Sequence, residues 1–372
     1  MTGRVRVSAA MIVRNEERFL AGCLESLSGR VEEIVVVDTG SSDDTVGIAG
    51  RTPGVRLLHH RWNDDFAAAR NVALDAASGD WILYIDADER LGLPKGGVVA
   101  DYIDPGAVAG FVRFRPKTGY TRYREWRLFR SDPRIRFAGK IHETIKPAVR
   151  LLSAREGLPI VRTEVELDHI GYDGDQSHKH GRNLALLEIA VRADPDRVYC
   201  WHHMAETLAA LGRVQEAVAA AREGLARADR DLSNDQRAPA SLIVQFLARI
   251  EAELGGDPLD VIEAGLARMP DDHALWFLRG QALLRAGRPG EALEMAERLQ
   301  AIDPEDLCDG LLAYDRAIFR EKACELAALA CLRLGRRREA AAQFAAAARL
   351  APGDAAYRIK AIALNGPARV AP

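Results

Sequence analysis

The sequence has few cysteines, and none of them forms a redox or metal-binding pair. The 372 residues include 5 cysteines, at positions 23, 200, 308, 324 and 331, and no Cys-x-x-Cys occurs. This usage fits reduced thiols better than a disulfide framework. We therefore expect a cytoplasmic protein.

Long apolar runs and a strong net charge are also missing. No apolar stretch approaches the length of a membrane-spanning helix, and Val5–Val13 is too short and too interrupted for an export signal. The net charge of −3 gives no support for a nucleic-acid partner. With 48% hydrophobic and 28% charged residues, the chain has the composition and length of two globular domains.

The first half of the chain alternates short apolar runs with helical patterns. The apolar runs are Val5–Val13, Ile34–Val37, Val55–Leu58 and Trp81–Ile85, and helical spacing follows the first three at Phe19–Leu27, Val46–Ala49 and Phe66–Ala77. Short apolar strands between helices indicate an α/β domain with a mostly parallel sheet that is covered on both faces. Ligands bind such sheets beyond the carboxyl ends of the strands.

Two carboxylates, Asp86 and Asp88, follow the fourth of these strands. In an extended segment, residues two apart point the same way, so both carboxylates can address one ion. Mg²⁺ and Mn²⁺ take oxygen ligands and often share them with a substrate diphosphate. An isolated Asp-x-Asp is also common as a turn or a helix cap.

Four stretches in the same order resemble the family 2 glycosyltransferases, whose GT-A fold is a nucleotide-sugar-binding α/β domain. They are Ser8–Glu17, Val35–Thr45, Phe66–Leu74 and Gly79–Glu89. Within that family, Met11–Glu17 and two later stretches, Arg127–Arg130 and Ile141–Glu143, resemble two soluble subgroups. These are the sugar transferases of lipopolysaccharide-core type and the SunS-type bacteriocin-modifying peptide glycosyltransferases. The lack of membrane spans argues against a processive polysaccharide synthase.

The resemblance implies roles for individual residues in binding a nucleotide sugar, and a UDP-sugar is the donor that we expect. Asp38 would contact the nucleoside, Asp86 and Asp88 would hold Mn²⁺ or Mg²⁺ against the diphosphate, and Arg70 would lie near that diphosphate. The motifs around them add Arg14, Asn15, Glu16 and Ala87 to the donor site. Two plainer interpretations stay open: Asp38 begins an Asx turn before Gly40, or Arg70 is an ordinary exposed helix residue.

The resemblance also implies a general base and a further metal ligand. Glu143 is the candidate base, with Asp168 in reserve, and His142 would bind the acceptor or orient Glu143. His169 resembles the late histidine that completes the metal site in many GT-A enzymes, although a hydrogen-bonded histidine at a strand end is the alternative. Lys146 stands where a zinc protease would have its second histidine, so a His-Glu-x-x-His site is excluded.

The second half is alanine-rich and helical, and a short phrase recurs in it. The copies are Leu211-Gly212-Arg213, Ala286-Gly287-Arg288 and Leu334-Gly335-Arg336, each followed by Glu-Ala, with a weaker copy at Leu254-Gly255-Gly256. This pattern resembles tetratricopeptide repeats, with irregular spacing. We therefore predict two domains, a GT-A domain at 1–175 and an all-α helical-repeat domain at 176–372. Stacked helix pairs present a surface for peptides or proteins, serve as a dimerisation face, or only buttress the catalytic domain.

These patterns together predict a soluble, metal-dependent, inverting glycosyltransferase. Its acceptor is a peptide or protein, or else a small molecule, and its repeats are a candidate homodimer interface. The first alternative is a repeat scaffold that binds a nucleotide sugar without turnover. A nucleotidyltransferase on a related fold ranks last, because the glycine-rich, lysine-containing phosphate loop is missing.

Overall fold

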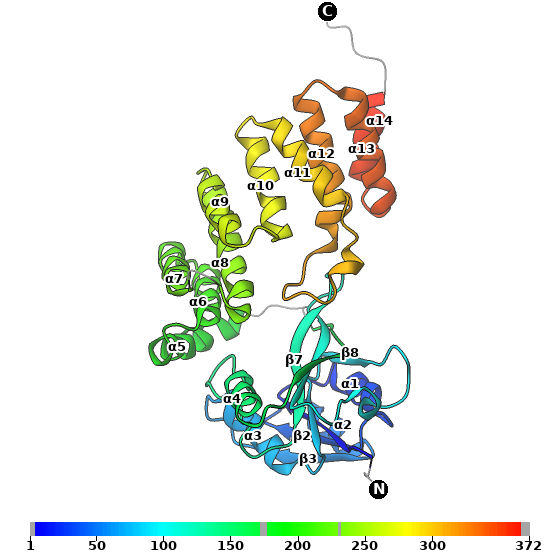
Figure 1. Ribbon diagram of the computed structural model, residues 1–372, viewed down its shortest axis with the longest axis vertical. Helices are drawn as coiled ribbons and strands as arrows, with labels where there is room; N and C mark the ends of the chain where they lie inside the picture. Colours follow the sequence, from blue (N-terminus) through cyan, green and yellow to red (C-terminus); the bar gives the residue numbers. More distant parts are fainter. Residues whose placement is uncertain (1–3, 172–176, 230–231, 366–372) are drawn as a thin grey trace, which may run out of the picture. The chain divides into compact units, whose positions relative to one another are not determined.

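The computed structural model describes residues 4–171, 177–229 and 232–365, and these form two compact units. The first unit contains Met1–Ala193 together with the short segment Cys308–Ala313, and the second contains Asp194–Leu307 and Tyr314–Pro372. Figure 1 shows the elements of each unit. The domain boundary that we predicted between residues 175 and 176 lies outside the described residues.

The first unit is built around one mixed sheet. In the described residues it has eight strands, in the order β3-β2-β1-β4-β7-β6-β8-β5. Their bounds are Val7–Val13 (β1), Glu33–Asp38 (β2), Val55–His59 (β3), Trp81–Tyr84 (β4), Glu89–Gly92 (β5), Ala109–Arg115 (β6), Tyr123–Arg130 (β7) and Ile160–His169 (β8). The four strands predicted from the apolar runs pair in parallel, so their carboxyl ends share one edge.

Helices cover both faces of this sheet, as a mostly parallel sheet requires. They are α1 (Leu20–Leu27), α2 (Thr45–Arg51), α3 (Phe66–Ala76) and α4 (Lys146–Glu156), with the 3₁₀ turn η1 (Val99–Tyr102), and α5 (Ser177–Ala193) is the last helix of the unit. Side chains alternate along β1, so that Ala9 and Met11 pack with α1 while Ala10 packs with α3 and α4. The predicted α/β fold class is confirmed.

The segment Cys308–Ala313, called here the return segment, belongs to the first unit although its neighbours in sequence belong to the second. Asp309 Oδ1 lies 3.1 Å from Arg113 Nε on β6 and 2.5 Å from Arg124 Nη2 on β7. The Arg124 amide donates a 3.0 Å hydrogen bond to the Gly310 carbonyl. Because only 5% of the Arg124 side chain is exposed, this carboxylate neutralises a cation that water scarcely reaches.

We expect Asp309→Asn to destabilise the first unit. The Arg124 guanidinium keeps its bonds to backbone carbonyls but loses its charged partner, which costs about 1–3 kcal/mol and lowers the melting temperature by roughly 5 °C. Thermal unfolding followed by circular dichroism measures the shift, and the exposed neighbour Asp306→Asn is the control. Equal melting of the two variants would contradict the expectation.

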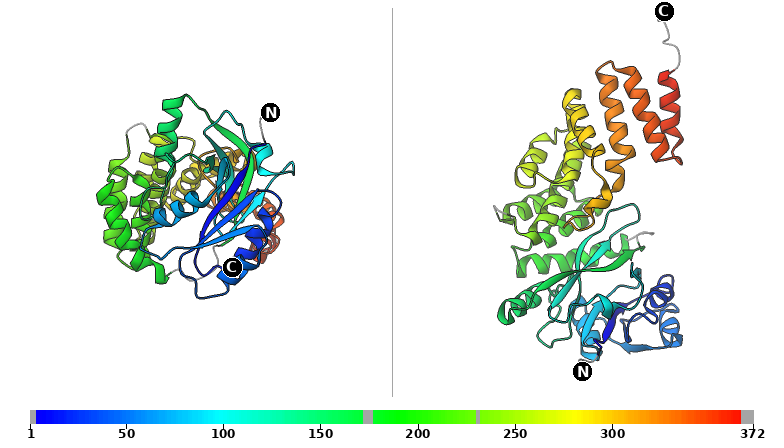
Figure 2. Two further views of the ribbon diagram at one scale, coloured as in Figure 1. Left: turned by 90° about the horizontal axis from the view of Figure 1, so that it is seen from below. Right: turned by 45° about the vertical axis from the view of Figure 1, so that its right-hand side comes forward.

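The second unit is entirely helical in the residues described. Its helices are α6 (Val198–Ala210), α7 (Val214–Arg227), α8 (Asn234–Glu253), α9 (Leu259–Arg268), α10 (His273–Arg285), α11 (Pro289–Gln300), α12 (Glu321–Arg333), α13 (Arg337–Leu350) and α14 (Ala355–Asn365), with 3₁₀ turns η2 (Pro304–Leu307) and η3 (Arg316–Phe319). Consecutive helices lie side by side, as the orange to red helices in the right view of Figure 2 show. No helix among the described residues has the length and apolar character needed to cross a membrane.

The recurring glycines lie where the sequence pattern puts the turns. Gly212, Gly255, Gly287 and Gly335 have φ between 74° and 80°, a left-handed conformation that costs glycine little. In each case the next residue donates to the carbonyl five positions earlier, as Arg213 does to Leu208 at 2.9 Å. These caps end α6, α8, α10 and α12; the next helix starts two residues after the glycine in three cases and at Leu259 after Gly255. The predicted all-α domain of helical repeats is confirmed.

Candidate active site

The predicted Asp-x-Asp forms a tight turn between β4 and β5 at the carboxyl edge of the sheet. The Glu89 amide donates to the Asp86 carbonyl at 3.0 Å and closes the turn. β5 then pairs with β8, where Glu89 is opposite His169. The Cys23 thiol of α1 donates to the same Asp86 carbonyl at 3.4 Å, and Ala87 is buried. The turn is therefore held from both sides.

Asp88 and His169 lie against each other at this edge. His169 Nε2 is 3.0 Å from Asp88 Oδ2, and His169 Nδ1 is 3.0 Å from the Pro116 carbonyl, which can only accept a hydrogen bond. Burial by itself would lower the pKa of His169, but the hydrogen bond to Asp88 and the charges of Asp88 and Glu89 raise it above its ordinary value. An imidazolium that donates through both nitrogens fits these contacts, whereas the neutral tautomer protonated at Nδ1 would keep the bond to Pro116 and offer Nε2 to a metal ion.

Gly171 follows this histidine and leaves no space for a side chain. A Cβ atom at Gly171 would stand 2.0 Å from Asp88 Oδ2. The Ile170 amide also donates to the Asp88 carbonyl at 2.9 Å. Gly171 therefore sets the direction of the Asp88 carboxylate, a role that sequence reasoning missed because the contact joins positions 83 residues apart.

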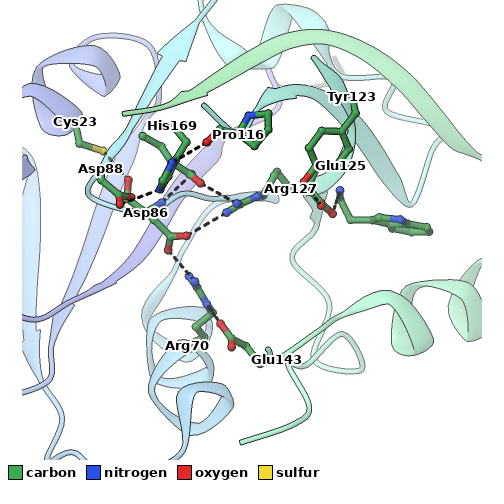
Figure 3. A network of polar contacts seen from close by, with 12 residues as sticks. Cys23, Arg70, Asp86, Asp88, Pro116, Tyr123, Glu125, Arg127, Glu143 and His169 are labelled. Atoms are coloured by element: carbon green, nitrogen blue, oxygen red, sulfur yellow. Dashed lines mark hydrogen bonds and ion pairs between the residues drawn. The ribbon is translucent and has the colours of Figure 1, made fainter. Parts of the chain in front are cut away.

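Asp86 points at two arginines. Arg70 Nη2 donates to Asp86 Oδ1 at 2.7 Å, and Arg127 Nη1 lies 3.5 Å from Oδ2 (Figure 3). Burial alone would raise the pKa of Asp86, but the charges of Arg70 and Arg127 and the hydrogen bond from Arg70 lower it to about 2. Asp86 therefore stays ionised at any physiological pH.

Arg70 joins Asp86 to Glu143, the predicted base. Helix α3 is capped by the Asp65 side chain, and Arg70 follows one turn later with its Nε donating to Glu143 Oε1. The Asn71 amide exchanges two hydrogen bonds with the Phe137 backbone, at 2.9 and 3.0 Å, and so anchors the segment that leads to Glu143. The structure thus places Arg70 between Asp86 and Glu143, and its side chain is only 11% exposed, so it is not an ordinary exposed helix residue.

Arg127 and Glu89 form a buried ion pair behind Asp86. Arg127 Nη2 donates to Glu89 Oε1 at 2.8 Å, and the two side chains are 10% and 1% exposed. The guanidinium carbon lies 4.5 Å from the Tyr84 ring centroid and 4.9 Å from that of Phe114. Arg127 Nε and Nη1 have no hydrogen-bond acceptor in the described residues. Two buried N–H groups are thus available to an anion beside Asp86.

A β-bulge explains why strand alternation does not predict the direction of the Arg127 side chain. Gly110 pairs with Leu128 and Phe111 with Trp126, so β7 holds one extra residue, Arg127, between these pairs. Bulges re-aim a side chain, and they are frequent beside active sites. Simple alternation along the strand does not predict where such a side chain points.

Asp168, the reserve candidate for the base, lies in a different cluster. It accepts from Arg115 Nη2 and from Arg122 Nη2, the latter at 2.9 Å. Arg122 also pairs with Glu166 at 3.0 Å. No described contact joins Asp168 to Asp86 or Asp88, although it neighbours His169 in sequence.

The loops after β1 and β2 bind each other. Asn15, at φ 57°, accepts from the Ser42 amide at 2.8 Å, and the Glu16 amide donates to Thr45 Oγ1 at 2.7 Å. Arg14 beside them is exposed. A non-glycine residue held in this left-handed conformation is typical of functional loops.

Asp38 makes the Asx turn that was the alternative interpretation. Its buried carboxylate accepts from the amides of Gly40 and Ser41 at 3.0 and 3.1 Å, and His59 Nδ1 lies 3.6 Å away. A carboxylate oxygen accepts more than one hydrogen bond, so the turn leaves the predicted nucleoside contact open. That contact stays a prediction.

The side chains of Asp88 and His169 fit a divalent cation that also takes phosphate oxygens. In residues 4–171, 177–229 and 232–365, no group of three or more His, Cys, Asp or Glu side chains is arranged around a common point. The protein would therefore supply two ligands, and substrate or water would supply the others. The carboxylate of Asp86 is engaged by arginines, so its predicted part in holding a metal stays a prediction.

We expect Gly171→Ala to weaken Mn²⁺ binding by about 10–100-fold, because the methyl group turns the Asp88 carboxylate away from His169. Electron paramagnetic resonance of free Mn²⁺, titrated in the presence of UDP, measures the affinity. Gly50→Ala is the control, since a Cβ there meets nothing within 4 Å. Unchanged affinity in Gly171→Ala would contradict the role given to Gly171.

Three relatives share much of this chain. A TPR repeat-containing protein of Synechococcus elongatus is 36% identical over 234 residues, covering 59% of this chain and 56% of that protein. The SPbeta prophage-derived glycosyltransferase SunS of Bacillus subtilis is 28% identical over 228 residues, covering 57% and 51%. The chain thus spans about half the length of these two relatives.

The third relative is a glycosyltransferase, and the family comparison matches a glycosyltransferase family within the first unit. The lipopolysaccharide core biosynthesis glycosyltransferase LpsC of Rhizobium meliloti is 35% identical over 218 residues, which cover 51% of this chain and 78% of LpsC. Residues 8–152 match the sequence model of glycosyl transferase family 2. That range contains the Asp86 and Asp88 turn, Arg70, Arg127 and Glu143, and the chain belongs to glycosyltransferase family 2.

Proposed function

We propose that this chain transfers a sugar from a nucleotide-sugar donor to an acceptor, with inversion at the anomeric carbon. The observation that carries the proposal is the convergence of Asp88 with His169, and of Asp86 with Arg70 and Arg127, at the carboxyl edge of the parallel strands. Ligands of α/β sheets bind at that edge. Membership of glycosyltransferase family 2 supports the same conclusion.

The donor would lie across the ends of the parallel strands. The nucleoside belongs beside Asp38 and the Asn15 loop, and the diphosphate belongs at Arg70 and Arg127, whose Nη1 atoms have no hydrogen-bond acceptor in the described residues. Guanidinium groups recognise phosphate oxygens through directed hydrogen bonds. Arg70 and Arg127 would thus orient the diphosphate and stabilise the charge that develops on it.

Asp88 and His169 would hold Mn²⁺ or Mg²⁺ when one is bound, with Asp86 as a further candidate. Such a cation supplies positive charge to the departing diphosphate. Gly171 leaves the space that the Asp88 carboxylate occupies, and the Ile170 amide holds the Asp88 backbone.

The transfer step needs a base that takes the acceptor proton while the acceptor atom attacks the anomeric carbon. The bond from that carbon to the diphosphate oxygen breaks, and its electron pair leaves with the nucleoside diphosphate. The sequence named Glu143 for this role with Asp168 in reserve, but Arg70 occupies Glu143 Oε1, and Arg115 and Arg122 bind Asp168.

The second unit supports a peptide or protein acceptor over a small molecule, because helical repeats suit extended ligands. SunS among the relatives is a glycosyltransferase, and another relative is a repeat protein. The name of LpsC refers to lipopolysaccharide core, so a saccharide acceptor is the second candidate. The repeats are also a candidate homodimer interface.

Calorimetric titration of UDP-, GDP- and dTDP-sugars, each with Mn²⁺ and with EDTA, tests the proposal. We expect one donor, a UDP-sugar, to bind in the presence of Mn²⁺, and slow release of its nucleoside diphosphate to follow. If no donor binds under either condition, the proposal fails. Binding without any turnover would instead support a repeat scaffold that only recognises the nucleotide sugar.

A further inference from the structure

Most carboxylates of the polar network in Figure 3 are already held by a cationic side chain. Their partners are Arg70 and Arg127 for Asp86, His169 for Asp88, Arg127 for Glu89, and Arg70 for Glu143. These cations hydrogen-bond carboxylate oxygens of Asp86, Glu89 and Glu143, and Glu89 is also only 1% exposed, although burial raises its pKa to about 7. A base that takes a proton from an acceptor needs a carboxylate oxygen that no cation hydrogen-bonds and that the acceptor can reach.

Glu125 of β7 meets that requirement. The Tyr123 hydroxyl donates to its Oε2 at 3.0 Å, and the Trp126 amide donates to its Oε1 at 2.8 Å. The nearest cationic nitrogen among its described contacts, Lys146 Nζ, is 3.9 Å away, beyond hydrogen-bonding distance. The Glu125 side chain is 20% exposed against 10% for Glu143, so an acceptor reaches it more easily.

Glu125 also lies next to the groups assigned to the diphosphate. In Figure 3 the Arg127 guanidinium lies between the Asp86 carboxylate and Glu125. Burial raises the pKa of the Tyr84 phenol, and the negative charges of Glu125 and Asp86 add to that rise while Arg127 and Arg70 oppose it. The charged and titratable groups facing Glu125 are thus Tyr123 and Arg127 on β7, Tyr84 on β4 and Lys146 on α4.

We propose that Glu125 is the general base of the transfer step and that Tyr123 orients its carboxylate. This inference rests on the proposed function. Glu125 takes the proton of the acceptor X–H group, the freed electron pair of X forms the bond to the anomeric carbon, and the bond from that carbon to the diphosphate oxygen breaks. Glu143 then has the separate role of holding Arg70 in place for the diphosphate.

The experiment compares Glu125→Gln with wild type in hydrolysis of the nucleotide sugar that wild type binds most tightly, with water as the acceptor. Release of nucleoside diphosphate is followed from pH 4 to 9, and donor affinity is measured by calorimetry. We expect kcat to fall by about 100-fold or more while donor affinity is preserved, and the acidic limb of the wild-type pH profile to disappear. Sodium formate should restore part of the rate in Glu125→Ala, because it replaces the missing carboxylate.

Two further variants separate a base from a structural residue. Glu143→Gln should weaken donor binding and keep the acidic limb, and Glu164→Gln on β8, outside the network, should match wild type. Wild-type turnover in Glu125→Gln would overturn the proposal. So would a slow variant that keeps the acidic limb and shows no formate rescue. A wild-type protein that binds no donor would refute the proposed function itself, and the base with it.

Discussion

Replacing Asp88 by asparagine is expected to lower sugar transfer by at least about 1000-fold while the melting temperature changes by no more than a few degrees. Asparagine keeps the size of the side chain but loses the charge that faces His169 at 3.0 Å. The side chain is partly exposed at a turn, so its loss removes little burial. Release of nucleoside diphosphate and thermal unfolding measure the two effects.

The control for Asp88→Asn is Asp80→Asn, at the opposite end of the same strand. Asp80 is exposed and pairs with Arg6 at 3.7 Å, so its charge can be removed without touching the site. We expect wild-type transfer in Asp80→Asn. Normal turnover in Asp88→Asn would remove Asp88 from the mechanism, and equal loss in both variants would point to a general charge effect.

The positions of Asp38 and Asp86 at the carboxyl edge of the sheet could be predicted from the sequence, because each residue comes directly after a short apolar strand. Val35, Val36 and Val37 are fully buried, so the first polar residue after them, Asp38, has to come at the sheet edge. The same reasoning holds for Asp86 after Trp81–Tyr84. The local apolar pattern thus predicts which residues end each strand, and parallel pairing of the strands brings these ends together.

The partners of those residues could not be predicted in the same way. Arg127 reaches Asp86 only because of the bulge in β7, and Gly171 matters only because β8 ends beside Asp88. Neither feature has a local signature, since both depend on register between strands far apart in sequence. Asp168 and His169 are adjacent in sequence, which suggested that they share a site. In the structure Asp168 pairs with Arg122 and His169 pairs with Asp88, so neighbours in sequence belong to different clusters.

The return segment has consequences for any truncation experiment. Removal of everything after residue 181 would delete the repeats, but α5 continues to Ala193 and Asp309 binds β6 and β7. Such a cut would divide a helix of the first unit and leave Arg124 without its carboxylate. Surface substitutions in the repeats are therefore a cleaner test of acceptor recruitment than deletion.

Arg127→Met is expected to lose both stability and activity. It leaves Glu89, 1% exposed, without its cation, and breaking a buried pair costs about 3–5 kcal/mol, which lowers the melting temperature by roughly 10 °C. Transfer should fall by about 100–1000-fold because one of the two guanidinium groups assigned to the diphosphate is gone. The single variant alone cannot distinguish unfolding from lost chemistry.

The double variant Glu89→Gln with Arg127→Met separates these effects. The Asp86 amide donates a 3.0 Å hydrogen bond to Glu89 Oε2, and the glutamine side-chain oxygen can still accept it. Because glutamine is neutral, the double variant leaves no buried charge unpaired. We expect the double variant to melt close to wild type and to remain as inactive as Arg127→Met, with weaker binding of UDP in calorimetry. Recovery of transfer together with stability would show that Arg127 only neutralises Glu89, and the diphosphate would then depend on Arg70 and the Asp88–His169 pair alone.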